Sequence, residues 1–358
     1  GLPDLVMRDG GNGDKILVRY NRLFSVDKLV SVDAFYGNHI EIGYAQADYS
    51  PMSRQRPTVM QTLSVSDATG KSGDVRQFSF QYSNYVHSVS ERTPYGFSNV
   101  TITQFSDNHP YRVIRQHYRT DVYKMRGRKD FERIEDAQGH WYVEHDWEYE
   151  LKQIADGIIV PVDKQHCFDA TWPALNIARV RYFDPSNNDV MIETVEQYNH
   201  EGYGRVKQYV NRNNSQTTDD DMICDVKYTR RNRNQTALPQ DIFVYDDSNN
   251  LLQHREAKYY PNGLLENLIL HNNSSLSITD YHYDQYGNVS HVVLPENNGG
   301  ERPKYIYDYD NLVHQFRISV TDMIWGDKSR TNYDIRLGVP LRVYSVGGDS
   351  ISYTYDDW

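Results

Sequence analysis

The sequence predicts an all-β protein built from antiparallel β-hairpins. Tyrosine is the first reason: the chain holds 30 Tyr against 11 Phe and 5 Trp, and a tyrosine ring packs on a half-buried strand surface while its hydroxyl reaches water. The second reason is period-two alternation of apolar and polar residues in the first half of the chain. The third is a Tyr-Asp motif that recurs at a nearly constant interval in the second half. No stretch of useful length shows a helical stripe of apolar residues.

Composition limits both the core and the partners. Only 38% of the 358 residues are hydrophobic, which argues against a thick layered core and favours long sheets with one face in water. The formal net charge of −11 argues against a nucleic-acid partner, because such a partner needs a basic surface. No apolar run approaches the length of a membrane span.

The beginning of the chain resembles a hairpin. Residues 5–7 and 16–18 are apolar triplets on either side of a Gly- and Asp-rich stretch, residues 8–14, which is the pattern of two short strands around a turn. Residues 9–14 also offer oxygen ligands for calcium, but they lack the alternating acids and the bidentate Glu of an EF-hand loop. No signal peptide is recognisable, and residues 1–4 resemble the middle of a strand-and-turn unit. We therefore expect a fragment or a processed piece of a longer protein.

Alternating strands continue to about residue 153. Apolar residues occupy every second position in several runs, so each strand turns one face inward and leaves the other polar. Turns are predicted at residues 67–70, 94–96 and 136–139. The clearest alternating residues are Ile40, Ile42, Tyr44, Phe78, Phe80, Tyr82, Val100, Ile102, Trp141, Val143, His145, Trp147 and Tyr149.

An internal repeat, Tyr-Asp-x-x-Gly/Asn-x-Leu/Val, follows in the last part of the chain. Its copies begin at Tyr245, Tyr259, Tyr283 and Tyr307, with weaker copies at 333 and 355. From Tyr259 onward the leading residues are 24, 24, 26 and 22 positions apart, a regularity that chance Tyr-Asp pairs would not keep. Repeats with a period of this size indicate a stacked architecture.

Each repeat is predicted to be one hairpin. Tyrosine ends the incoming strand, Asp opens the turn by accepting hydrogen bonds from backbone amides, and Gly or Asn supplies the left-handed position. One hairpin is marginally stable in water, whereas hairpins stacked side by side complete one another. The predicted structural turn residues are Tyr245, Asp246, Tyr259, Gly263, Tyr283, Asp284, Gly287, Tyr307, Asp308, Asn311, Tyr333 and Asp334.

These repeats resemble the Rhs/YD-repeat family, and the order of segments before them resembles the B component of bacterial insecticidal toxin complexes. Residues 2–6 look like the end of a VCBS- or integrin-type propeller blade. Residues 29–44 resemble the segment that follows this propeller in toxin B components and SpvB-like proteins. Residues 95–102 are similar to their Gly-Phe-x-x-Val-Thr strand, and 127–128 with 136–139 to the passage that leads into the repeats.

The resemblance implies three regions: a propeller end at residues 1–22, a linking antiparallel β region at 23–153, and YD-repeat hairpins at 154–358. In that family the repeats wind into a hollow β shell or spiral sheet around a toxic C-terminal polypeptide. The implied function is a non-catalytic segment of a secreted or cell-surface toxin shell. Implied partners are the rest of the shell, including a C-component-like chain and its payload, and a pore-forming A-component-like translocator.

This chain departs from the family pattern in two ways. Several repeats have Asn where Gly is usual, and the usual Gly-Arg is mostly replaced. The Asp-Pro-x-Gly motif that accompanies self-cleavage in many relatives is absent from this sequence. No cleavage activity is therefore assigned to the chain.

No motif of an enzyme, cofactor or metal site is recognisable. The sequence lacks His-Glu-x-x-His, Gly-x-Ser-x-Gly, phosphate-loop and dinucleotide signatures. Residues 219–221 are three acids in a polar stretch and are interpreted as a solvated loop, while His282 and His291 are interpreted as strand-face residues. Cys167 and Cys224 are too few for a scaffold or a zinc site. We favour two unpaired cysteines, and a single disulfide remains an alternative.

Two other functions are kept as alternatives. The many exposed tyrosines would suit a cell-surface or glycan-binding YD-repeat module, although the regular spacing favours cross-strand packing. A glycosidase or lyase on a β scaffold is the second alternative, because the absence of known motifs does not exclude an enzyme.

Overall fold

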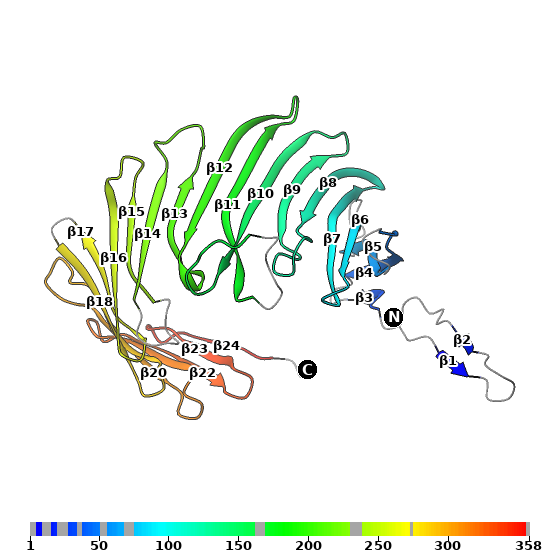
Figure 1. The fold of residues 1–358 in the computed structure, drawn as a ribbon. Helices are drawn as coiled ribbons and strands as arrows, with labels where there is room; N and C mark the ends of the chain where they lie inside the picture. Colours follow the sequence, from blue (N-terminus) through cyan, green and yellow to red (C-terminus); the bar gives the residue numbers. More distant parts are fainter. Residues whose placement is uncertain are drawn as a thin grey trace. The chain divides into compact units, whose positions relative to one another are not determined.

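The structure is a computed structural model that describes residues 5–8, 16–19, 28–33, 38–50, 56–67, 75–161, 169–229, 238–272 and 275–355. These residues form antiparallel strands joined by turns, with one 3₁₀ turn at Gly202–Gly204 and no α-helix among them (Figure 1). The predicted all-β class is confirmed.

The chain divides into two compact units. The first comprises residues 1–198 and 212–218, and the second comprises residues 199–211 and 219–358. In the first unit, β1 (Leu5–Arg8) pairs with β2 (Ile16–Arg19) as an antiparallel hairpin, as the sequence predicts. The calcium candidate at residues 9–14 lies outside the described residues, as do residues 1–4. The boundaries expected at residues 22 and 153 rest on the resemblance and stay predictions.

The main sheet of the first unit is a succession of hairpins, each strand pairing antiparallel with the next along the chain. The predicted alternating runs lie within β4, β6, β7 and β10. Its strands are β3 (Ser31–Asp33), β4 (His39–Gln46), β5 (Thr58–Ser66), β6 (Val75–Ser88), β7 (Thr93–Ser106), β8 (His109–Tyr118), β9 (Lys129–Asp136), β10 (Trp141–Gln153), β11 (Thr171–Asp184) and β12 (Asp189–His200).

The second unit repeats this organisation with shorter strands, which again pair in chain order. Its strands are β13 (Val206–Arg212), β14 (Met222–Thr229), β15 (Leu238–Tyr245), β16 (Leu251–Tyr259), β17 (Leu265–Asn272), β18 (Ser275–Tyr283), β19 (Val289–Val293), β20 (Lys304–Tyr309), β21 (Arg317–Asp322), β22 (Lys328–Asp334), β23 (Val339–Tyr344) and β24 (Ser350–Ser352).

One predicted turn is wrong. Residues 94–96 lie inside β7, and the chain reverses earlier, at residues 89–92. Gly96 has a φ of 97°, and it pairs with Val86 while Pro94 pairs with His87, so Tyr95 is the extra residue of a β-bulge. A glycine with positive φ serves a bulge as well as a turn, and the sequence alone does not separate the two. The turn predicted at 136–139 is confirmed, whereas most of the one at 67–70 lies outside the described residues.

Few of the described residues are buried. Along most strands, successive side chains are half-buried or exposed instead of alternating between buried and exposed, which agrees with the low hydrophobic content of the sequence. Among the described residues, the buried apolar side chains are Ala47, Tyr85, Met125, Leu151, Ala174, Phe183, Val195 and Ile269.

The most completely buried side chains belong to the first unit. Met125 and Ala174 are 0% exposed, and Leu151 is 1% exposed. Met125 lies in the loop between β8 and β9, whose base is closed by two hydrogen bonds, from the Arg119 amide to the Arg128 carbonyl (2.8 Å) and from the Gly127 amide to the Arg119 carbonyl (3.0 Å). The loop therefore supplies one of the few fully buried apolar side chains of the first unit.

Replacing Met125 tests this local core. We expect Met125→Ala to lower the free energy of unfolding by about 2–5 kcal/mol, because it leaves a cavity in a fully buried site. Met323→Ala is the matched control, since Met323 is 52% exposed and its loss should change stability by less than ~0.5 kcal/mol. Urea unfolding of the two variants measures both values. Equal effects would mean that the 119–128 loop contributes no core.

Candidate functional site

One hairpin turn recurs in both units, and Asp284 shows its geometry. The Asp284 amide donates to the Asn288 carbonyl (2.9 Å), and the Gly287 amide donates to the Asp284 carbonyl (3.2 Å). The Asp284 carboxylate accepts the amides of Tyr286 and Asn288, both at 2.9 Å. Gly287 has a φ of 87°, the left-handed conformation that closes a type I turn with a glycine bulge.

These amide donors stabilise the charged form of the turn carboxylate. Burial by itself raises the pKa of Asp284, but the hydrogen bonds from Asn288 and the turn amides outweigh it, and the pKa lies below its ordinary value. The pKa of Asp246 is lowered as well, mainly by the side chain and the amide of Asn250. In that turn Asn249 takes the left-handed position with a φ of 62°, which explains why Asn replaces Gly in this copy.

The same backbone pattern closes four further hairpins. The turns that begin at Asp136 and Tyr260 are predicted from the sequence, whereas those that begin at Asn297 and Ser345 lack a Tyr-Asp pair and are missed. The signal that finds them is the left-handed glycine three positions after the first turn residue. The first residue and the glycine of each turn are Asp136 with Gly139, Tyr260 with Gly263, Asn297 with Gly300, and Ser345 with Gly348.

The tyrosine before the turn lies at a β-bulge. The strand register shifts at Tyr245, Tyr259, Tyr283 and Tyr333. The Tyr259 hydroxyl donates to the Pro239 carbonyl at the start of the preceding strand (2.6 Å). Burial raises the pKa of this hydroxyl, so it stays a donor at neutral pH. Tyr228 and Tyr309 make the equivalent bond to the carbonyls of residues 206 (2.9 Å) and 289 (3.2 Å).

The predicted frame of the fourth repeat is wrong by two residues. Tyr307 and Asp308 lie within β20, where the Asp308 carboxylate accepts the Ser319 hydroxyl (2.5 Å) and the Lys328 ammonium (2.9 Å). The bulge lies at Tyr309 instead. The leading tyrosines at 259, 283, 309 and 333 are therefore 24, 26 and 24 residues apart.

Asp310 is the turn carboxylate of this hairpin. It is 6% exposed and accepts the amides of residues 312–316 at 2.7–3.2 Å. Burial opposes ionisation, but these amides outweigh it and hold the pKa of Asp310 far below its ordinary value. His314, with a φ of 55°, takes the left-handed position that was predicted for Asn311, because this loop is longer than the other turns.

The structure brings some of the predicted residues together and separates others. The turns that begin at residues 260, 284, 310 and 334 lie at the same end of the second unit's strands, because antiparallel strands reverse at each hairpin. The Asp246 turn lies at the opposite end of the strands. Successive turns at the shared end contact one another. The Tyr286 ring stacks on His314 (centroids 3.9 Å), and the side-chain Nδ2 of Asn288 donates to the His314 carbonyl (2.7 Å). Phe316 stacks on Tyr333 (5.2 Å).

Tyr333 and Asp334 begin the last turn at this end of the strands. The Asp334 carboxylate accepts the amides of Arg336 (2.9 Å) and Leu337 (3.2 Å). The Gly338 amide closes the turn on the Asp334 carbonyl (2.7 Å). This turn is one residue longer than that of Asp284, so its left-handed glycine, Gly338, comes one position later.

Ion pairs link the strands of the first unit on one face. Arg133, Glu144, Arg181 and Glu193 are directly opposite one another on β9, β10, β11 and β12. Glu144 accepts Arg133 (2.6 Å) and Arg181 (2.8 Å), and Arg181 also binds Glu193 (2.8 Å). The Glu144 side chain is only 9% exposed, so this row is a hydrogen-bonded network rather than a set of isolated surface pairs.

Stacked rings link the strands of the second unit. Phe243, His254 and His271 form a row across β15, β16 and β17, with centroids 4.2 and 3.9 Å apart. Carboxylates hold the two imidazoles: His254 contacts Asp241 (2.9 Å), and His271 contacts Glu256 (3.1 Å). On β18 and β19, His282 stacks on His291 (4.1 Å). Both were predicted as strand-face residues, and the register places them directly opposite each other.

No reactive centre emerges from these contacts. Within the described ranges, no group of three or more His, Cys, Asp or Glu is placed to hold a metal ion, and no helix is long and apolar enough to cross a membrane. Cys224 is half-buried and has no disulfide partner there, while Cys167 lies outside the described residues. Asp219 and Asp220 are exposed as expected of a solvated loop, but Asp221 is buried.

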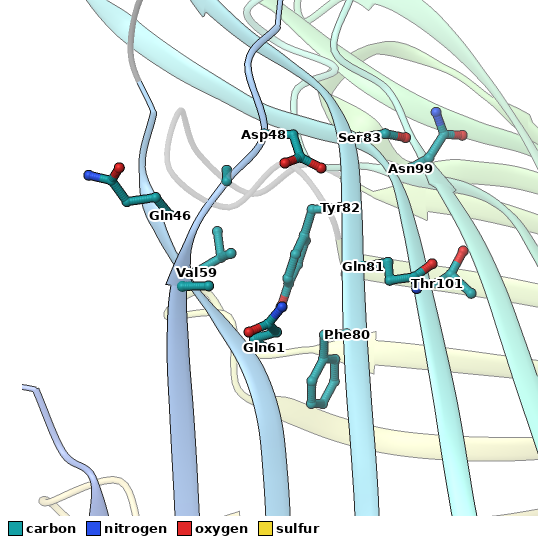
Figure 2. Close-up of a pocket in the computed structure, with 12 residues that line it drawn as sticks. Gln46, Asp48, Val59, Gln61, Phe80, Gln81, Tyr82, Ser83, Asn99 and Thr101 are labelled. Atoms are coloured by element: carbon teal, nitrogen blue, oxygen red, sulfur yellow. The ribbon is translucent and has the colours of Figure 1, made fainter. Parts of the chain in front are cut away.

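An opening lies between β5 and β6 in the first unit, where the two strands stop pairing. Its volume is about 450 Å³, and its lining includes Gln46, Asp48, Gln61, Phe80 and Tyr82. Figure 2 shows the Tyr82 ring lying in this opening. Amide, carboxylate and aromatic groups can bind a ligand by hydrogen bonds and stacking.

The two candidate turn carboxylates of the fourth repeat can be compared directly. We expect Asp310→Asn to lower the midpoint of thermal unfolding at least about twice as much as Asp308→Asn, because Asp310 accepts five backbone amides of its turn whereas Asp308 accepts only two side chains. Circular dichroism at neutral pH measures both midpoints. A larger effect of Asp308→Asn would restore the original frame of the repeat.

The stacked histidines predict a pH dependence of stability. The pKa of His291 is lowered by burial, by His282 on β18 and by Lys304 on β20. The unfolded chain therefore binds more protons than the folded chain once the pH falls through about 6.5, and stability decreases. Urea unfolding at neutral and mildly acidic pH measures this loss. His291→Asn and Lys304→Gln should both reduce it, and an unchanged dependence in both variants would contradict the assignment.

Comparison with known proteins gives structural neighbours only. No family model matches the chain, and no curated protein matches its sequence. The chain is similar in fold to the crystal structure of TcdB2-TccC3, with a TM-score of 0.65, 10% identity, and coverage of 90% of this chain and 24% of that one. The form of TcdB2-TccC3 without its hypervariable C-terminal region matches with a TM-score of 0.62, 10% identity, and 90% and 23% coverage.

A third neighbour is the Photorhabdus luminescens Tc holotoxin pore, with a TM-score of 0.63, 10% identity, and coverage of 87% of this chain and 22% of that one. The chain thus spans about a quarter of the length of the structures it matches. At this level of identity the similarity establishes a shared fold, the antiparallel hairpin sheet found in toxin-complex components.

Proposed function

We propose that the chain is a non-catalytic structural segment of a secreted toxin shell, which encloses a toxic C-terminal polypeptide. The observation that carries the proposal is the match of 90% of the chain to TcdB2-TccC3 at a TM-score of 0.65. A succession of hairpins with so little buried surface suits a wall, because a wall needs area and continuity rather than a thick core.

The side-chain chemistry supports the same role. The tyrosines and acids of the repeats are engaged in bulges and capped turns, as Tyr259 and Asp284 illustrate. Because these side chains make contacts within their own hairpins in one repeat after another, they support a structural role. The same contacts weaken the alternative of a glycan-binding surface made by the repeat tyrosines. Among the described residues, no grouping of side chains favours the glycosidase or lyase alternative.

The proposed partners follow from the same fold. The remainder of the shell would extend the sheet, the payload would lie inside it, and a pore-forming translocator would receive the payload. One structural neighbour is the Photorhabdus luminescens Tc holotoxin pore, in a form that carries a mutation in TccC3. Secretion follows for this chain if it shares that assembly.

Protease protection tests the proposal. The chain is produced together with the remaining segments of its parent toxin, and the assembly is digested with trypsin. We expect the enclosed polypeptide to remain intact, and to be cut at least about tenfold faster when Asp284→Ala and Asp310→Ala are combined, because loosened turns open the wall. Asp247→Ala, at an exposed turn position, is the control. A polypeptide that is cut equally fast in all three assemblies would contradict an enclosing role.

A further inference from the structure

The opening between β5 and β6 exists because the two strands separate. They pair only where residues 62–66 face residues 75–79. Beyond this point β5 follows β4 back to Thr58, while β6 follows β7 as far as Ser88. The chain after β4 then crosses to β6, where the Ser50 hydroxyl donates to the Tyr85 carbonyl (2.7 Å). The opening is therefore framed on all sides within the first unit.

The frame offers backbone groups as well as side chains. On the sides that face the opening, the edges at residues 59–61 and 80–83 have no strand partner within the described part of the chain. Peptide N–H and C=O groups at such an edge are strong donors and acceptors that need a partner. Water satisfies them when the opening is empty, and a ligand with several hydroxyls could replace it.

The side chains around the opening combine rings with planar amides. Phe80 and Tyr82 are two residues apart on β6, so their rings share one face of the strand. Gln61 lies across the opening on β5, and Gln46 and Asp48 lie at the end of β4 (Figure 2). The other face of β6 adds polar groups from Gln81 and Ser83, together with Asn99 and Thr101 of β7.

The charge of the lining selects among ligands. Among the described residues that line the opening there is no Lys, Arg or His, and Asp48 is the only carboxylic acid. Arg56 lies beside this lining, but its Nε donates to the Ala47 carbonyl (2.9 Å). A phosphate, sulfate or carboxylate would therefore meet the negative charge of Asp48 with no cation among these lining residues to offset it. Alternating apolar pockets, which an added peptide strand uses for its side chains, are not what this polar lining provides.

We infer that the opening between β5 and β6 is a binding site for a neutral saccharide. Amide groups and strand edges bind sugar hydroxyls, aromatic faces stack on the apolar face of a pyranose ring, and about 450 Å³ is within the range of small-ligand sites. The site belongs to the alternating strands before the YD repeats. It does not depend on the proposed shell function.

Titration calorimetry with the full chain tests the site. The probes are maltotriose, chitotriose and N-acetyllactosamine as neutral saccharides, and sialyllactose as the acidic comparator. We expect at least one neutral probe to bind with a Kd of about 1 mM or tighter, and sialyllactose to bind at least roughly tenfold more weakly.

Two variants locate the binding. Gln61→Ala removes an exposed amide and should weaken binding about fivefold or more without affecting the fold. Tyr82→Ala should weaken it by about tenfold or more, since it removes the stacking ring. Because the Tyr82 ring also packs on Phe97 (centroids 5.0 Å), its fold is checked by circular dichroism. Tyr111→Ala, an exposed tyrosine on β8, is the matched control and should bind as the unmodified chain does.

Several outcomes would overturn the inference. These are the absence of binding by all three neutral probes at about 10 mM, equal binding of sialyllactose, and unchanged binding in Gln61→Ala. Displacement of the saccharide by a short extended peptide, with a gain in strand content, would assign the opening to strand addition instead. None of these outcomes bears on protease protection, so the two proposals are tested separately.

Discussion

The structure depends on one constraint: within each unit, the described strands bury very few apolar side chains. A sheet usually gains its stability by burying one face, but only eight apolar side chains in the described part of the chain are buried. Stability must then come from contacts within the sheet. The strands meet this need in different ways, with ion pairs such as Arg181–Glu144 in the first unit and stacked rings such as His254–His271 in the second.

The hairpin turns also compensate for the small number of buried apolar side chains. A strand pair without a packed face loses its register easily, and a capped turn with a glycine bulge sets that register at each reversal. Asp284 and Asp310 hold backbone amides that would otherwise be exposed. The tyrosine before the turn then ties the end of one strand to the start of the preceding one, as Tyr259 does with Pro239. The repeated Tyr and Asp residues thus set the register of the strands and serve a structural purpose.

The two proposals draw on different parts of this design. Where the described strands pair without interruption, most side chains are half-exposed, which suits a wall. Where β5 and β6 separate, strand edges at residues 59–61 and 80–83 lie beside aromatic rings and amides. The proposed binding site therefore lies where the sheet is interrupted, outside the repeats.

The amino-acid sequence by itself determined the class of fold and several of its hairpins, because period-two alternation and Asp/Gly turn chemistry act over a few neighbouring residues. It also located Asp246, Asp284 and Asp334 at turns. Only the tertiary structure decided between Asp308 and Asp310, since Tyr-Asp-Tyr-Asp contains both frames and strand pairing selects one. The same holds for Gly96, which forms a bulge instead of a turn, and for the opening beside Tyr82. These features depend on which strands lie next to each other and for how long, and no local pattern contains that information.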